Sequence, residues 1–171
     1  MQARSVHRTI ALAMALIFSS AIAAAPARAQ DGGIAVGAHA PTAIVHSLDG
    51  KPVDLASIIG KGPALIEFWA TWCPICKELE PAITAAQKKY AGRVKFVTVA
   101  VGVNESAERV RRHVAAHNMT QTVVYDATGK AADVYDAPAT TYVVLLDRTG
   151  RVVYTGVGGT QDLDAAIRKA L

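Results

Sequence analysis

The sequence predicts an α/β domain in which a central mixed β-sheet is flanked by helices. Residues 64–69 and 94–101 are almost wholly apolar, which is typical of central strands buried on both faces. A helical pattern separates these two runs, and another follows the second run. Alternating strands and helices favour parallel pairing, whereas strand–turn–strand patterns near both ends require antiparallel pairing, so both kinds are expected in one sheet.

The N-terminal part of this domain is expected to be a β-hairpin. Residues 42–48 have β character, and Asp49-Gly50 is a strong turn signal that leads into a returning strand at 51–54. A short helical turn follows at 55–59, where Gly60 ends it.

The middle of the chain carries the longest predicted helices. Residues 73–90 form the first, with Pro81 expected to kink it. The buried strand at 94–101 leads to an amphipathic helix at 106–117. A short strand is then expected at 122–125.

The C-terminal part reads as a hairpin and a closing helix. Strands at 142–146 and 151–155 flank a turn at 147–150. Residues 162–171 then show one apolar stripe, which favours a helix packed on the sheet. No repeat or internal linker indicates a second domain.

Residues 1–29 are interpreted as a signal peptide. The segment starts with positive charge, residues 10–25 are nearly all apolar, and Ala27-Arg28-Ala29 supplies small residues for cleavage. A membrane anchor is the alternative, because the apolar run approaches the minimum length of a span. Cleavage near Ala29 leaves one domain at 30–171 and predicts export, to the periplasm in a bacterium, where the environment is oxidising.

The charge of the chain does not favour nucleic-acid binding. The formal net charge is +4, but Arg4, Arg8 and Arg28 belong to the segment that cleavage removes. The basic cluster in the mature part fits the solvated face of the helix at 106–117 better than a docking patch; it consists of Arg109, Arg111 and Arg112.

Cys73 and Cys76 are the only cysteines, so an intrachain disulfide must join them. So small a loop stabilises the fold little, which favours a reactive pair over a structural one. The pair lies between the strand at 64–69 and the helix that follows, and a helix N-terminus stabilises a thiolate. A zinc half-site and inert thiols are the alternatives, although no second cysteine pair completes a zinc site.

The segment around these cysteines resembles the thioredoxin superfamily, in particular its exported, redoxin-type TlpA/ResA-like branch. The resemblance covers nearly all of residues 30–171 and is carried by Gly37-Ala38-His39-Ala40-Pro41, by residues 49–55 and 68–78, and by Pro81. It implies a thioredoxin fold with an N-terminal β-hairpin extension. It also implies a thiol:disulfide oxidoreductase in which Cys73 is the exposed nucleophile and the more buried Cys76 resolves the mixed disulfide.

Glu67 is an unexpected charge in an apolar strand. By the resemblance, it lies behind the disulfide and accepts the Cys76 proton; a glutamate directed to solvent is the alternative. Trp69 is expected in the core beneath the site. We expect Trp72 to cover Cys73 and shape the surface that meets the partner.

Substrate contacts are also expected from Pro74 and Ile75, between the cysteines, and from Thr140 and Thr141. The thioredoxin superfamily carries a cis-proline opposite its cysteines, and here that position falls on Thr141 unless Pro138 is shifted into the role. The surface opposite the cysteines therefore departs from the family pattern.

No metal ion or other cofactor is expected besides the redox-active Cys73–Cys76 disulfide. His113 and His117 have the i, i+4 spacing of metal ligands, but a solvated helix face suits them better because no third ligand is evident. The expected partners are protein thiols and disulfides, with apocytochrome c and copper-site proteins as candidates, and a membrane thiol donor that supplies electrons; the protein itself is expected to be a monomer. The alternative functions are a copper-binding metallochaperone that uses the cysteine pair and a peroxiredoxin-like thiol peroxidase.

Overall fold

A computed structural model describes residues 32–171, so the expected signal peptide at 1–29 lies outside the described residues. The strands are β1 (Ile44–His46), β2 (Pro52–Asp54), β3 (Ala64–Trp69), β4 (Lys95–Val101), β5 (Thr122–Asp126), β6 (Tyr142–Leu146) and β7 (Val152–Gly156). The helices are α1 (Leu55–Ile59), α2 (Pro74–Lys89), α3 (Ala107–Ala116), α4 (Lys130–Val134) and α5 (Leu163–Ala170). Every predicted element is present, with each end within two residues of its expected position.

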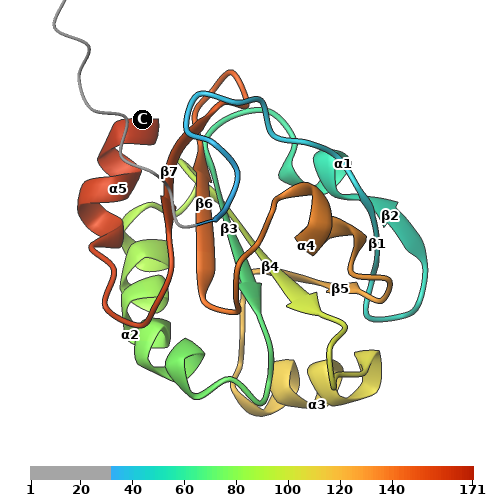
Figure 1. The fold of residues 1–171 in the computed structure, drawn as a ribbon. Helices are drawn as coiled ribbons and strands as arrows, with labels where there is room; N and C mark the ends of the chain where they lie inside the picture. Colours follow the sequence, from blue (N-terminus) through green and yellow to red (C-terminus); the bar gives the residue numbers. More distant parts are fainter. Residues whose placement is uncertain (1–31) are drawn as a thin grey trace, which may run out of the picture.

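All strands of the described part join one mixed sheet in the order β2-β1-β5-β4-β3-β6-β7 (Figure 1). β3, β4 and β5 are parallel neighbours, whereas β6 and β7 on one side and β1 and β2 on the other run antiparallel. The prediction of a mixed sheet is therefore confirmed. β3 is paired on both sides, so it lies inside the sheet and not at its edge. The cysteine segment follows directly from the end of this strand.

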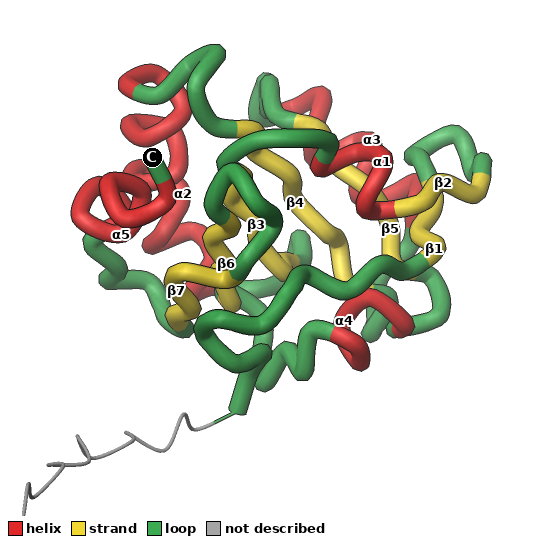
Figure 2. The backbone as a smooth tube through the Cα atoms, turned by 90° about the horizontal axis from the view of Figure 1, so that it is seen from above, coloured by secondary structure: helices red, strands yellow, loops and turns green. Residues whose placement is uncertain are grey.

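Helices cover both faces of the sheet (Figure 2). α2, α3 and α5 lie over one face and α4 over the other. Under α2 and α5, Leu65 and Leu145 pack among buried side chains of both helices. The opposite face holds an aromatic cluster in which Phe68 lies 5.4 Å from Tyr135 and 5.8 Å from Tyr142 between ring centroids.

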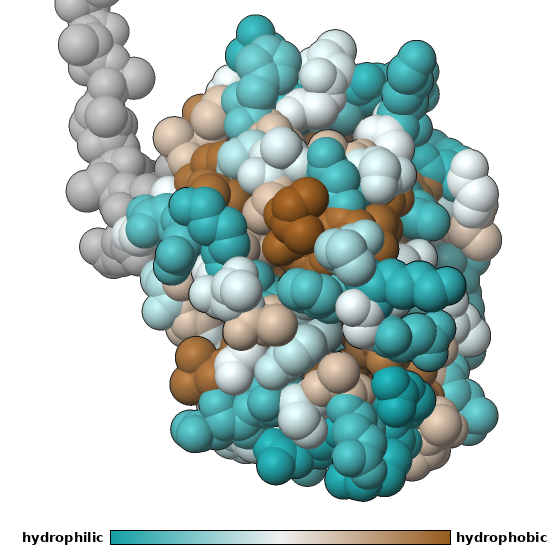
Figure 3. Space-filling model, turned by 90° about the vertical axis from the view of Figure 1, so that its right-hand side faces the viewer, coloured by the Kyte–Doolittle hydropathy of each residue, from teal (hydrophilic) through white to brown (hydrophobic). Residues whose placement is uncertain are grey.

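The side of the molecule that carries β1 and β2 is mostly hydrophilic, with a central hydrophobic area and smaller ones around it (Figure 3). β2 forms the edge, and it has only three residues and begins with Pro52. A short edge strand that carries a proline offers few free backbone groups to another strand. Within residues 32–171 no helix has the length and apolar character that crossing a membrane requires.

Helix α4 is the element that the sequence analysis did not predict. Its N-cap is Gly129, which has no side chain for capping. The cap comes instead from Asp126, a fully buried residue at the end of β5 whose carboxylate accepts hydrogen bonds from the backbone N–H groups of Ala131 (3.2 Å) and Ala132 (2.9 Å). A helix of five residues depends on such contacts, because its own hydrogen bonds are too few.

We expect Asp126→Ala to lower the free energy of unfolding by about 1–3 kcal/mol, since two N–H groups of α4 lose their acceptor. Asp126→Asn keeps one acceptor oxygen and should cost less. Asp133→Ala, at an exposed position of α4, is the matched control. Urea denaturation monitored by circular dichroism measures the three values, and equal midpoints for all three variants would contradict the assigned cap.

Candidate active site

The cysteine pair lies where β3 ends and α2 begins, as the sequence predicted. Cys73 is the N-cap of α2, Pro74 is its first residue, and the two cysteines form a disulfide with their Cα atoms 5.3 Å apart. The backbone N–H of Cys76 donates a hydrogen bond to the Cys73 sulfur at 3.2 Å. After reduction the same N–H and the positive end of the helix dipole favour a thiolate at Cys73.

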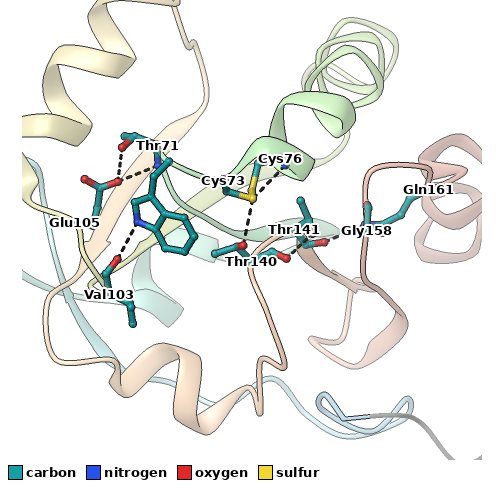
Figure 4. Close-up of a disulfide and its surroundings, with 10 residues drawn as sticks. Thr71, Cys73, Cys76, Val103, Glu105, Thr140, Thr141, Gly158 and Gln161 are labelled. Carbon is teal, nitrogen blue, oxygen red and sulfur yellow. Dashed lines mark hydrogen bonds between the residues drawn. A yellow bond between two sulfur atoms is a disulfide. The ribbon is translucent and has the colours of Figure 1, made fainter.

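The burial of the pair differs from the expected contrast between an exposed and a buried cysteine. In the disulfide form Cys73 is 3% exposed and Cys76 is 2% exposed. Cys73 is covered by the loop before β6, from which the Thr140 hydroxyl donates a hydrogen bond to the Cys73 sulfur at 3.2 Å (Figure 4). Trp72 and Ile75 are large hydrophobic residues exposed beside the pair, each accessible over almost half its surface, as suits contacts with a partner.

The residues before Cys73 are held by the loop between β4 and α3. The carboxylate of Glu105 accepts hydrogen bonds from the backbone N–H of Thr71 (2.9 Å) and from its hydroxyl (2.6 Å). The indole N–H of Trp72 donates to the carbonyl of Val103 at 2.9 Å. Sequence reasoning missed Glu105, because a glutamate next to the helix N-cap Ser106 has an ordinary local explanation.

Glu67 is buried beside α2, and the alternative of a solvent-directed side chain is wrong. It is 4% exposed, and burial raises its pKa to about 8, despite the weak opposing effect of the Thr98 hydroxyl at 3.5 Å. Within residues 32–171 the carboxylate forms no hydrogen bond to either cysteine in the disulfide form. The raised pKa brings the ionisation of Glu67 into the physiological pH range.

A cavity of about 350 Å³ between α2 and α3 connects Glu67 with the surface. Its walls include Trp69 from β3, Glu80 from α2, and His113 and His117 from α3. Trp69 is buried, as expected for a residue beneath the site, and its ring lies edge-on to His113 at 5.0 Å. The cavity gives water a route to a carboxylate that would otherwise be isolated.

The two histidines of α3 stack with ring centroids 3.8 Å apart. Burial, followed by the charge of its neighbour His117, lowers the pKa of His113. The described part of the chain contains no group of three or more His, Cys, Asp or Glu side chains that could hold a metal ion.

The loop opposite the cysteines is formed by Thr140 and Thr141. Thr141 is 1% exposed and has a φ of 64°, a left-handed conformation that is costly for a β-branched residue, at about 1–3 kcal/mol. Its carbonyl accepts a hydrogen bond from the Gln161 side chain at 3.0 Å. Pro138 is exposed instead, and all peptide bonds of the described residues are trans. Gln161 was not singled out from the sequence, because no local pattern connects it with Thr141.

Comparisons with known proteins agree with this geometry. The Redoxin family matches residues 35–170. The thiol-disulfide oxidoreductase ResA of Bacillus subtilis is 31% identical over 125 residues, which span 73% of this chain and 69% of the relative. The thioredoxin-like protein YneN of the same organism is 32% identical over 130 residues, or 75% of each protein.

A solved structure extends the similarity to three dimensions. A thiol:disulfide interchange protein of the thioredoxin family from Chlorobium tepidum shares 30% sequence identity with a TM-score of 0.62, covering 80% of this chain and 98% of that one. StoA from Bacillus subtilis, at 23% identity and a TM-score of 0.59, shares the fold. This chain therefore belongs to the Redoxin family, within the thioredoxin superfamily, and is a thiol:disulfide oxidoreductase with a thioredoxin fold.

Proposed function

We propose that the protein is exported and reduces disulfides of other proteins, with Cys73 as the attacking thiol and Cys76 as the resolving thiol. The observation that carries the roles is the placement of the Cys73 sulfur at the N-terminus of α2, within 3.2 Å of a backbone N–H donor. Cys76 lies inside the helix and lacks that position. A thiolate is the reactive form of cysteine, so the cysteine at the helix terminus is the better nucleophile.

The reaction has two exchange steps. The Cys73 thiolate attacks one sulfur of the substrate disulfide, forms a mixed disulfide, and releases the other substrate sulfur as a thiolate. The Cys76 thiol then loses its proton and attacks the Cys73 sulfur, which forms the Cys73–Cys76 disulfide and releases the second substrate thiolate. Two electrons thus pass from the reduced pair to the substrate, and both released thiolates take up protons according to their pKa.

Glu67 is proposed as the acceptor of the Cys76 proton. A base with a pKa near the working pH is effective, because an appreciable fraction is ionised and the proton is still held firmly. The raised pKa of Glu67, about 8, meets this condition. Since the carboxylate forms no hydrogen bond to the cysteines, a water molecule in the adjacent cavity is the proposed carrier.

The partners are proposed to be protein disulfides that meet the exposed Trp72 and Ile75. Pro74 and Thr140 complete that surface, whereas Thr141 is buried and supports the loop behind Thr140. Apocytochrome c and copper-site proteins are the proposed substrates, and a membrane thiol protein is the proposed electron donor, because an oxidising compartment does not reduce the pair by itself. Export rests on the signal-like segment 1–29, with cleavage near Ala29 and monomeric action afterwards.

The reduction potential of the Cys73–Cys76 pair tests the direction of electron flow. We expect a value closer to about −270 mV than to about −120 mV, on the scale set by thioredoxin and by a strong oxidant. Equilibration of the purified domain 30–171 with glutathione, read by thiol alkylation and mass spectrometry, measures it. A value near that of the oxidant would overturn the reductive role. A parallel peroxide assay should show negligible turnover beside fast reduction of insulin disulfides.

A further inference from the structure

A second loop lies against the cysteine segment, namely residues 157–162 between β7 and α5. A side chain added at Gly159 would come within 2.6 Å of the Glu78 Cβ atom and 3.2 Å of the Ile75 carbonyl. The backbone of this loop therefore packs directly on the first turn of α2, where the two cysteines lie. The contact requires a residue without a side chain, so the loop follows the active-site helix closely.

Gln161 connects this loop with the loop that covers Cys73 (Figure 4). Its side-chain amide donates one hydrogen bond to the Thr141 carbonyl at 3.0 Å and another to the Gly158 carbonyl at 2.7 Å. Its side-chain oxygen accepts a hydrogen bond from the Tyr154 hydroxyl at 3.1 Å. Both polar atoms of the carboxamide are thus engaged, which fixes the orientation of the side chain.

The hydrogen bond from Gln161 to the Thr141 carbonyl acts on a residue whose backbone conformation is strained. Thr141 has a left-handed φ of 64°, which threonine adopts only when its surroundings impose it. Thr140 precedes it, and the direction of the Thr140 hydroxyl depends on the backbone at this point. That hydroxyl is the donor to the Cys73 sulfur at 3.2 Å.

We propose that Gln161 is a positioning residue that holds Thr141 in its left-handed conformation and so keeps the Thr140 hydroxyl on the Cys73 sulfur. In the reduced protein this hydroxyl donates to the Cys73 thiolate and stabilises it. Gln161 acts only through Thr140 and touches no sulfur. The inference rests on the proposed role of Cys73 as the attacking thiol.

The central measurement is the rate of iodoacetamide alkylation of Cys73 against pH, in the reduced domain with Cys76→Ser. We expect Thr140→Val to move the midpoint upward by about one pH unit, as the loss of a hydrogen bond to a charged acceptor predicts. Gln161→Met, which has similar size without the amide, should move it in the same direction by a comparable amount. The double variant should show little more than either single change, because both remove the same hydrogen bond.

Two outcomes would overturn the proposal. One is an unchanged midpoint in Gln161→Met while Thr140→Val moves it; the other is a shift in the double variant equal to the sum of the single shifts. Thr160→Ala, at an exposed position of the same loop, is the control and should leave the midpoint unchanged. If Gln161→Met does not fold, Gln161→Glu retains the acceptor oxygen and removes both donated bonds. It must give an upward shift that disappears in the Thr140→Val background, because the added charge alone would shift the midpoint in both backgrounds.

A separate experiment distinguishes this inference from the proposed roles of the cysteines. In the reduced domain with both cysteines present, limited alkylation followed by peptide mass spectrometry shows which cysteine reacts first. Preferential labelling of Cys76 would contradict the role of Cys73, whatever Gln161 does. Preferential labelling of Cys73 together with a midpoint insensitive to Gln161 would contradict only the positioning role.

Discussion

Cys76→Ser is expected to stop turnover and to accumulate a mixed disulfide between Cys73 and the substrate protein. The first exchange step needs only Cys73, whereas release of the substrate needs the sulfur of Cys76. Loss of either reacting group in such a sequence should lower the rate of insulin reduction by at least about 1000-fold. Non-reducing gel electrophoresis should show the adduct, and mass spectrometry should locate it at Cys73.

Cys73→Ser is the matched control for the trapping experiment. It should be equally inactive but form no stable adduct, because the remaining thiol lies inside α2. Both variants should unfold at nearly the wild-type denaturant concentration, since a loop this short contributes little entropy. Adducts that form through Cys76 in the Cys73→Ser variant and not through Cys73 in the Cys76→Ser variant would reverse the two roles.

Glu67→Gln is expected to slow the reaction by about 100-fold at neutral pH, the lower end of the range for loss of a general base. The wild-type rate should rise as pH passes through about 8, where Glu67 loses its proton. The variant should lack this rise. Stopped-flow measurement of tryptophan fluorescence during disulfide exchange, from about pH 6 to about pH 9, gives both profiles, and rates equal to wild type over this range would exclude Glu67 as the base.

The same substitution should change how stability depends on pH. The folded protein retains the Glu67 proton up to a pKa of about 8, whereas the unfolded chain releases it near 4.5. Protonated Glu67 therefore contributes fully to the free energy of unfolding below about pH 4.5. This contribution decreases as pH rises to about 8, and the total decrease is up to about 5 kcal/mol at 1.36 kcal/mol per pH unit. Glu67→Gln should remove this loss, so its advantage over wild type should grow from about pH 5 to about pH 9 in urea denaturation.

Glu80→Gln is the control for both effects of Glu67. Glu80 is exposed, lies on the wall of the same cavity, and raises the pKa of Glu67 through its charge. Its removal should lower the pH midpoint slightly and leave the base in place. Loss of the whole pH-dependent rise in Glu80→Gln, with the rise intact in Glu67→Gln, would show that Glu80 and not Glu67 is the base.

The fold follows closely from the sequence wherever a local pattern carries the information. Apolar runs located β3 and β4, Asp49-Gly50 located the first hairpin, and the amphipathic stripe at the C-terminus located α5. Helix α4 was not predicted because it depends on the buried Asp126, whose capping role becomes visible only once the position of β5 is known. The same limit applies to Glu105, since its contact with Thr71 spans 34 residues.

The sequence by itself determined the chemistry of this protein: a reactive pair at Cys73 and Cys76, at the start of a helix, with a carboxylate at Glu67 in the preceding strand. The spacing of these residues along one strand and one helix determines how they are placed relative to one another, because side-chain directions repeat regularly in both kinds of element. Only the tertiary structure decided what surrounds the pair: the burial of Cys73 beneath Thr140 and the bond from Gln161 to Thr141. These contacts join segments far apart in the chain, and their geometry exists only after the sheet and helices have packed.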